Sequence, residues 1–151
     1  MEELKSVKIT TLADNSVQAS NLLGQWGLSL LLEVEDQESK IHKIILDTAA
    51  VKEGLLHNIN KLRPDLSDLE YIVLSHGHSD HTATIVELLR MAKGEVKVIA
   101  HPHAFLRKFV TKKDGKRIEN GVPKGERIKN IHEAGGRLIT SEKPFEKLSD
   151  K

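Results

Sequence analysis

Residues 71–82 read YIVLSHGHSDHT, a short apolar run followed at once by a loop rich in metal-binding side chains. The run YIVL has no polar alternation, which is typical of a strand buried on both faces of a sheet. The loop then places four potential metal ligands within six consecutive positions: His76, His78, Asp80 and His81. Binding sites in open α/β sheets form at the carboxyl ends of strands. The stretch therefore predicts a metal site at the end of a central strand.

The spacing of these four residues indicates how they could share metal ions. In an extended segment His76 and His78 project to the same side, and Gly77 between them has no side chain to block a close approach. Asp80 and His81 then enter a turn and can face a second position. Neutral imidazole and carboxylate are ligands for zinc, iron or manganese. We expect one or two ions, most simply zinc, rather than a surface loop that is rich in histidine by accident.

The rest of the chain shows strand-like and helix-like patterns in alternation, with no internal repeat or linker. Runs rich in β-branched residues indicate strands, and apolar residues at helical spacing indicate helices. The expected strands are 7–12, 28–34, 41–46, 71–74, 96–100 and 137–140, and the expected helices are 51–62, 83–92 and 124–134. An Asp-Gly pair at 114–115 indicates a hairpin. This order predicts one α/β (α+β) layered domain over residues 1–151.

Composition excludes several classes of protein. The 151 residues, 38% hydrophobic and 30% charged, fit one soluble globular domain. The chain has no cysteine, which excludes disulfides and thiolate metal sites and fits a reducing cytoplasm. The start MEELKSVKIT lacks the apolar run of a signal peptide, and no apolar run is long enough to cross a membrane. We expect a cytoplasmic protein with no membrane partner.

Charge is unevenly distributed along the chain. Residues 107–129 hold nine basic and three acidic residues, a net charge of +6, whereas the whole chain has +1 and the remainder therefore −5. Such asymmetry is typical of an anion-binding face, and it is equally compatible with a solvated hairpin and helix.

The motif LSHGHSDH, together with IILDTA at residues 44–49, resembles the metallo-β-lactamase fold hydrolases. Within that family, the chain is similar to the dihydropterin–ribofuranosylaminobenzene-phosphate synthase proteins of methanopterin biosynthesis. The similar stretches are KITTLADN, GLSLLLE, LSDLEYIVLSHGHSDHTA and IAHPHAF. The resemblance implies a four-layer αβ/βα sandwich with metals at one edge of its two sheets.

The resemblance also implies roles for individual residues. It matches His76 and His78 with ligands of a first metal, and Asp80 and His81 with ligands of a second. It matches Asp47 with a residue that supports the loop. A carboxylate at the end of the 41–46 strand could accept hydrogen bonds from the histidine loop and orient its imidazoles. An aspartate that caps a helix or a turn would fit the same position.

The chain departs from the family pattern in two ways. Ala49 stands where the family usually has glycine after LDT, which implies a different turn. Complete members also continue well beyond this length and take a further histidine, a bridging carboxylate and a last histidine from their second half. We assign none of these to His132, which lies in an expected helix. We expect the first half of a sandwich, completed by self-association or by a complementary C-terminal half.

Four residues outside the loop are candidates for substrate binding. His101 follows the 96–100 strand, where it could reach the site or start a helix. Trp26 lies between glycines in a loop that borders the active-site groove in the family, although packing on its own hairpin is an alternative. Lys112 and Lys113 belong to the basic segment, which could attract a phosphorylated substrate.

We interpret the chain as a metal-dependent hydrolase that uses a metal-activated water, with Asp80 and Asp47 in the catalytic machinery. A phosphorylated pterin or ribofuranosyl-aminobenzene precursor is the expected substrate. A nucleic-acid-processing metallo-hydrolase is an alternative, but base stacking needs aromatics and the basic segment offers only Phe109 beside Phe105. A second alternative is a non-catalytic half-domain or metal-binding interaction module.

Overall fold

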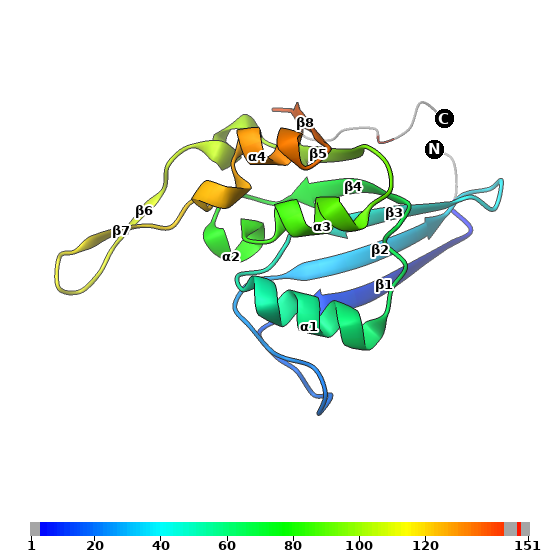
Figure 1. The fold of residues 1–151 in the computed structure, drawn as a ribbon, viewed down its shortest axis with the longest axis horizontal. Coiled ribbons are helices and arrows are strands. Elements are labelled where there is room, and N and C mark those ends of the chain that lie inside the picture. The colour runs from blue at the N-terminus through cyan, green and yellow to red at the C-terminus, as the bar shows by residue number, and fades with distance from the viewer. Residues whose placement is uncertain (1–3, 144–147, 149–151) are drawn as a thin grey trace.

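A computed structural model describes residues 4–143 and residue 148. Its main sheet has six strands in the order β1-β2-β3-β4-β5-β8 (Figure 1). The strands are β1 (Ser6–Ala13), β2 (Ser29–Glu35), β3 (Ile41–Leu46), β4 (Leu69–Leu74), β5 (Val96–Ala100) and β8 (Gly136–Thr140). The first three strands form an antiparallel meander, and β3, β4, β5 and β8 run parallel. The predicted mixed α/β architecture and the hairpin of the second and third strands are confirmed.

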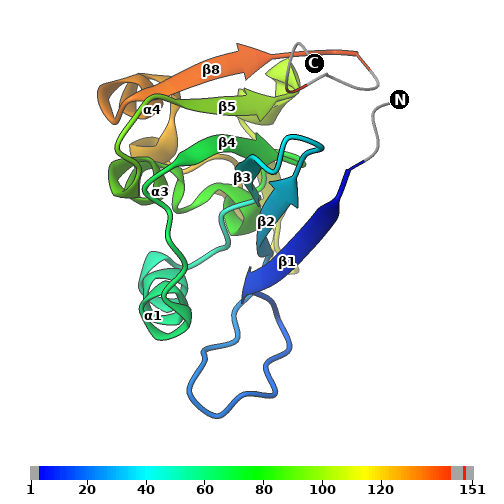
Figure 2. The same cartoon turned by 90° about the vertical axis from the view of Figure 1, so that its right-hand side faces the viewer.

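Helices cover one face of the sheet, as Figure 2 shows for α1 (Lys52–Leu62), α3 (Ile85–Met91) and α4 (Ile128–Glu133). Apolar residues alternate along the strands, so every second side chain points toward these helices. The fully buried core on this face includes Leu31, Ile45, Leu55, Ile72, Ile85, Leu88, Val98 and Ile131. Aliphatic side chains fill this core.

Two predicted helices differ from the observed ones. The expected helix 83–92 is preceded by a separate helical turn, α2 (Ser79–Thr82), so the histidine loop ends inside helix. Hydrogen bonds explain the early start, because the carbonyl of His78 accepts from the backbone N–H of His81 and from the hydroxyl of Thr82. The expected helix 124–134 is divided into η2 (Lys124–Glu126) and α4 by the extended backbone of Arg127.

The opposite face of the sheet is mostly apolar, and none of the helices among the described residues packs on it (Figure 2). The strand register places half-buried aliphatic side chains in one row across five strands. The row consists of Leu30, Leu46, Val73, Ile99 and Ile139. At the edge, Val7 and Ile9 of β1 are 46% and 60% exposed. A broad apolar face of this kind is typical of a surface that packs against another layer.

A second, two-stranded sheet consists of β6 (Phe109–Thr111) and β7 (Arg117–Glu119). It follows η1 (Pro102–Phe105) and projects away from the body of the molecule beyond α2 (Figure 1). Gly115 has φ +81° in the connecting turn, which an Asp-Gly pair favours. The predicted hairpin is therefore confirmed.

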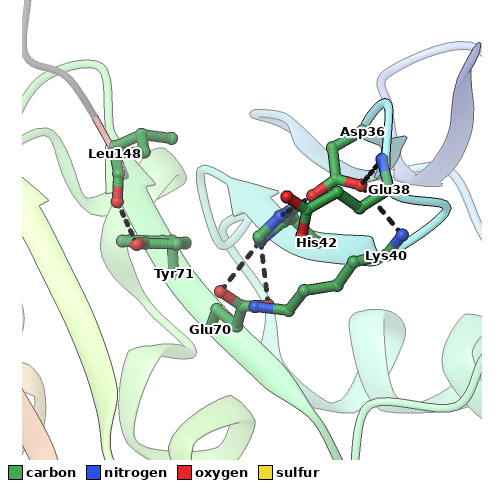
Figure 3. Close-up of polar contacts among 7 residues, drawn as sticks. All are labelled: Asp36, Glu38, Lys40, His42, Glu70, Tyr71 and Leu148. Carbon is green, nitrogen blue, oxygen red and sulfur yellow. Dashed lines mark hydrogen bonds and ion pairs between the residues drawn. The ribbon is translucent and has the colours of Figure 1, made fainter. Parts of the chain in front are cut away.

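A polar cluster lies at the end of the sheet where β3 and β4 begin (Figure 3). Nδ1 of His42 lies 3.1 Å from both carboxylate oxygens of Glu70, and its Nε2 lies 3.3 Å from Oδ2 of Asp36. Nearby, the hydroxyl of Tyr71 donates to the carbonyl of Leu148. Because β3 and β4 run parallel, their carboxyl ends, which are followed by Asp47 and by the histidine loop, both lie at the opposite end of the sheet from this cluster.

No helix among the described residues has both the length and the apolar character needed to cross a membrane.

Candidate metal centre

The candidate metal ligands lie at the carboxyl end of β4, as predicted, and Asp47 lies at the carboxyl end of the neighbouring strand β3. Asp47 follows β3 directly, and the histidine loop follows β4. The two segments are joined by main-chain hydrogen bonds. The N–H of Asp47 donates to the carbonyl of Val73 at 2.9 Å, and the N–H of Thr48 donates to the carbonyl of His81 at 2.8 Å. The ends of two parallel strands therefore form one rigid platform.

Asp47 is the buried centre of this platform, with 1% of its surface exposed and φ 58°. Its Oδ1 accepts from the backbone N–H of Ser75 at 2.8 Å. Its Oδ2 accepts from the hydroxyl of Ser75 at 2.6 Å and from Nδ1 of His81 at 2.8 Å. Aspartate tolerates the left-handed backbone better than most residues. These contacts support the predicted role in holding the loop, and Asp47 caps no helix, because α1 begins at Lys52.

The same hydrogen bonds determine which imidazole nitrogens face outward. An ionised carboxylate only accepts, so Nδ1 of His81 carries the proton. The hydroxyl of Ser75 donates to Asp47 and lies 2.9 Å from Nδ1 of His76, from which it accepts. Both rings therefore leave Nε2 free as a ligand atom. This is how a carboxylate orients metal-binding histidines and raises their basicity.

Three side chains meet at one point. One ligand atom each of His76, Asp80 and His81 lies within 4.8 Å of the others. The ring centres of His76 and His81 are 4.2 Å apart, and Nε2 of His81 lies 3.6 Å from Oδ2 of Asp80. Burial, followed by the neighbouring imidazoles of His81 and His78, lowers the pKa of His76 below its ordinary value. A lowered pKa favours the neutral ring that binds metal.

His78 lies beside this three-residue cluster and is exposed. Its ring centre is 4.8 Å from that of His76, with the two planes almost perpendicular at 88°. The structure thus brings three of the four predicted ligands together and places the fourth at the rim. Two imidazoles and a carboxylate match the donor set and the number of protein ligands that catalytic zinc takes.

Two glycines allow the backbone segments around the site to approach closely. A Cβ on Gly77 would lie 1.7 Å from the carbonyl oxygen of Ala104, so the histidine loop rests on η1 rather than leaving space at this residue for an ion. Gly27 has φ +91°, and a Cβ there would lie 1.6 Å from the carbonyl oxygen of Asp80. The sequence places Gly27 beside Trp26, in a loop expected to border the site. Its contact with the metal loop was not predicted.

The other predicted residues occupy the surroundings of the site. Trp26 is 73% exposed, so it is not packed on its own hairpin, and its neighbour Gly27 touches Asp80. Nδ1 of His101 accepts from the N–H of His103 and thereby caps η1. Lys112 and Lys113 lie in the turn of the β6–β7 hairpin. His132 is exposed on α4, with Nδ1 3.1 Å from the carbonyl of Gly136.

Sequence reasoning missed the residue that ties the hairpin to the metal loop. Asn120, directly after β7, accepts through its carbonyl from the N–H of Ser79 at 3.2 Å and through Oδ1 from the Ser79 hydroxyl at 2.8 Å. Ser79 precedes Asp80. A lone asparagine after a short strand carries no sequence signal for such a contact.

Comparison with known proteins agrees with this geometry. The family model described as "Beta-lactamase superfamily domain" matches residues 42–135. The chain is 32% identical, over 95% of its length and 48% of the relative's, to the 7,8-dihydropterin-6-methyl-4-(beta-D-ribofuranosyl)-aminobenzene-5'-phosphate synthase of Methanocaldococcus jannaschii. It is 33% identical to an uncharacterized protein of that organism, over 67% of this chain and 37% of the relative. It therefore spans about half or less of the length of these curated relatives.

A solved structure shows the same fold. The metallo-beta-lactamase fold protein YhfI from Bacillus subtilis superposes with a TM-score of 0.52 at 15% identity, covering 93% of this chain and 48% of that one. Together with the match of the family model over most of the chain, this superposition shows that the chain belongs to the beta-lactamase superfamily domain family and has the metallo-β-lactamase fold.

Proposed function

We propose that this chain provides the metal-binding part of an enzyme that acts on a phosphorylated pterin or ribofuranosyl-aminobenzene precursor. The observation that supports the proposal best is the cluster of His76, Asp80 and His81, whose imidazoles are oriented from behind by Asp47 and Ser75. The substrate class is suggested by the printed name of the M. jannaschii relative. A zinc ion held in the cluster would act as a Lewis acid toward a phosphoryl or carbonyl oxygen and lower the pKa of a coordinated water.

The residues of this chain have separate tasks in the proposed site. His76, Asp80 and His81 hold one ion, and His78 at the rim is placed to bind a second or to contact substrate. Iron or manganese fits the same nitrogen and oxygen donors. Asp47 keeps the proton of His81 on Nδ1 and thereby presents Nε2. Trp26, exposed beside Gly27, offers a flat apolar surface on which a pterin ring can stack.

The test combines metal analysis with a substrate assay. We expect the purified protein to bind one or two equivalents of zinc, and the His76→Ala and His81→Ala variants to bind much less. Metal-loaded protein should consume the phosphorylated precursors, whereas the variants should not. Full metal content in both variants would refute the assignment of the cluster. Normal metal content without turnover would restrict the chain to the alternative role below.

The open sheet face supports a second proposal, that another layer packs on this chain. The row from Leu30 to Ile139 and the exposed Val7 and Ile9 form an apolar surface of the kind that sandwiches bury. The layer would be a second copy of the chain or the remainder of a longer polypeptide, and without it the chain would be a metal-binding interaction module. Light scattering of the Ile9→Lys variant and of the parent chain tests whether a second copy supplies the layer. In that case the variant should be monomeric and the parent dimeric. If both are monomeric, the second copy is excluded.

A further inference from the structure

Six of the nine basic residues of the 107–129 segment fall into two groups, which the charge count alone does not distinguish. At the base of the β6–β7 hairpin, the guanidinium groups of Arg107 and Arg127 lie 3.2 Å and 3.0 Å from Oε1 of Glu119. Their hydrogen bonds and charges hold the pKa of Glu119 below its usual range, so the carboxylate is ionised. Lys108 points inward, and its Nζ donates to the carbonyls of His103 and Ala104 at 2.8 Å and 2.9 Å. The base is therefore internally satisfied.

The tip of the hairpin is different. Lys112, Lys113 and Lys116 are exposed, and none of their ammonium groups has a carboxylate within salt-bridge distance among the residues that the structure describes. The single acid of the turn, Asp114, has its Oδ1 occupied by the backbone N–H of Lys116 at 3.0 Å. Three free positive charges are thus held together in a tight turn closed by the bond from the Lys112 N–H to the Lys116 carbonyl at 2.9 Å.

The hairpin is fixed to the metal loop at its base. Asn120 accepts two hydrogen bonds from Ser79, in the first turn of α2 that also carries Asp80 and His81. From Asn120 to Lys116 is four residues, which corresponds to about 13 Å along an extended strand. Figure 1 shows the hairpin projecting beyond α2 in this way. The tip cations are therefore too far from the cluster to touch a group bound there, but they keep a defined distance from it.

We propose that the hairpin tip is a phosphate subsite for the far end of an elongated ligand whose near end reaches the metal cluster. This inference rests on the proposed function and adds a length requirement to it. The charge pattern supports it: the metal-binding cluster lies at one end, Arg107 and Arg127 are held on Glu119 in the middle, and lysines without a carboxylate partner lie at the other end. A ligand with one phosphate at its far end complements these lysines. A short phosphate ester cannot occupy both ends at once.

A nucleic acid fits the same surface less well. Phe109 is the one aromatic residue of the hairpin, and its ring centre already lies 4.9 Å and 4.7 Å from the guanidinium groups of Arg107 and Arg117, whereas base stacking favours several aromatic side chains. Three lysines are also few compared with the 6–10 phosphate contacts that are typical of proteins whose nucleic-acid affinity falls steeply with salt.

The experiment compares two variants with the same change in charge. Lys112→Gln/Lys113→Gln/Lys116→Gln neutralises the tip, and Lys5→Gln/Lys61→Gln/Lys93→Gln neutralises three exposed lysines away from it. The probes are 4-(β-D-ribofuranosyl)-aminobenzene 5'-phosphate joined to a dihydropterin, its dephosphorylated form, inorganic phosphate and a short RNA. Binding is followed by the fluorescence of Trp26, the only tryptophan, and by calorimetry on zinc-loaded protein. Zinc content of each variant is measured in parallel.

We expect the tip variant to bind the phosphorylated conjugate about tenfold more weakly than the parent, with zinc content and binding of the dephosphorylated conjugate unchanged. The control variant should bind both like the parent. Equal affinity of the tip and control variants for the phosphorylated conjugate would overturn the subsite while leaving the proposed function intact. Failure of the parent to bind either conjugate would overturn both proposals. Tighter, salt-sensitive binding of RNA that depends on the tip lysines would replace the subsite with a nucleic-acid surface.

Discussion

Oδ2 of Asp47 lies 2.8 Å from Nδ1 of His81, so a buried carboxylate at the end of β3 orients a metal-binding ring at the end of the loop after β4. Because the Asp47 side chain also accepts two hydrogen bonds from Ser75, and Ser75 contacts His76, one carboxylate controls both imidazoles of the cluster. The metal geometry therefore depends on a residue that is 1% exposed and does not itself belong to the cluster.

Replacing Asp47 should weaken metal binding without abolishing it. Loss of a residue that orients a ligand typically costs about 10- to 100-fold in metal affinity. We expect Asp47→Ala to fall in this range and His81→Ala, which removes a ligand, to be worse. Chelator competition on both variants measures the difference. A larger loss for Asp47→Ala than for His81→Ala would make Asp47 itself a ligand.

His76 and His78 should contribute unequally to the bound metal. The ligand atom of His76 belongs to the three-residue cluster, whereas His78 is exposed at its rim. We expect His76→Ala to remove most of the metal and His78→Ala to remove less, with His132→Ala as an unaffected control on α4. Elemental analysis of the three purified variants decides. The reverse order would move His78 into the cluster and His76 out of it.

Gly77→Ala should destabilise the protein because it forces the histidine loop away from η1. A Cβ at this position would lie 1.7 Å from the carbonyl oxygen of Ala104, and its three nearest atoms all belong to the Ala104 backbone. We expect a loss of about 2 kcal/mol or more in the free energy of unfolding, together with weaker metal binding. Gly125→Ala is the matched control, since nothing lies within 4 Å of its Cβ. Urea unfolding of both variants tests this, and equal stability would contradict the close approach.

Glu126 should make folding stability depend on pH. Burial raises the pKa of its carboxyl from 4.5 to about 7, although it accepts from the N–H of Val86 at 2.7 Å. In the unfolded chain the carboxyl ionises at the lower pKa, so between about 5 and 7 the folded state holds the extra proton. Stability from this group is present below that window and is lost as pH rises through it.

Glu126→Gln should remove this dependence, because an amide still accepts from Val86 but does not ionise. We expect the variant to gain stability over the parent at pH 8 and to lose the advantage at pH 5. Glu53→Gln, in the first turn of α1, is the control. Denaturant midpoints at both pH values provide the measurement, and a constant difference between variant and parent would contradict the raised pKa.

The contact between Ser79 and Asn120 should couple the hairpin to the metal loop. Asn120→Ala removes the acceptor of the Ser79 hydroxyl, and Ser79→Ala removes the donor. We expect each to lower metal affinity by a few-fold and the double variant to be no worse than either, since residues in direct contact are not additive. Chelator competition on the three variants completes the cycle. Additive losses would show that the two residues act independently.

Local patterns in the sequence determined the elements and their types. The apolar run before the histidine loop was recognisable as a buried strand, and the spacing of its four ligand-type residues predicted a metal site at its end. That spacing paired His76 with His78 and Asp80 with His81, whereas the structure gathers His76, Asp80 and His81. These features depend on residues close together in the chain, where the alternation of side chains and the chemistry of the donors are sufficient. The early start of α2 was not predicted, because Ser79 in its first turn is held by Asn120, which is distant in the sequence. The break at Arg127, whose side chain reaches back to Glu119, was not predicted either.

Only the tertiary structure decided which distant residues complete the site. Gly27 meets Asp80, Gly77 meets Ala104, and Ser79 meets Asn120. Each contact joins segments that are far apart in the sequence and are brought together by the order of the strands. The tertiary structure also distinguished the lysines at the hairpin tip from the arginines at its base. A count of charge treats these residues alike. The physical reason is that a pattern in the sequence reports the burial and chemistry of one segment, whereas contact between segments depends on the backbone path that all of them share.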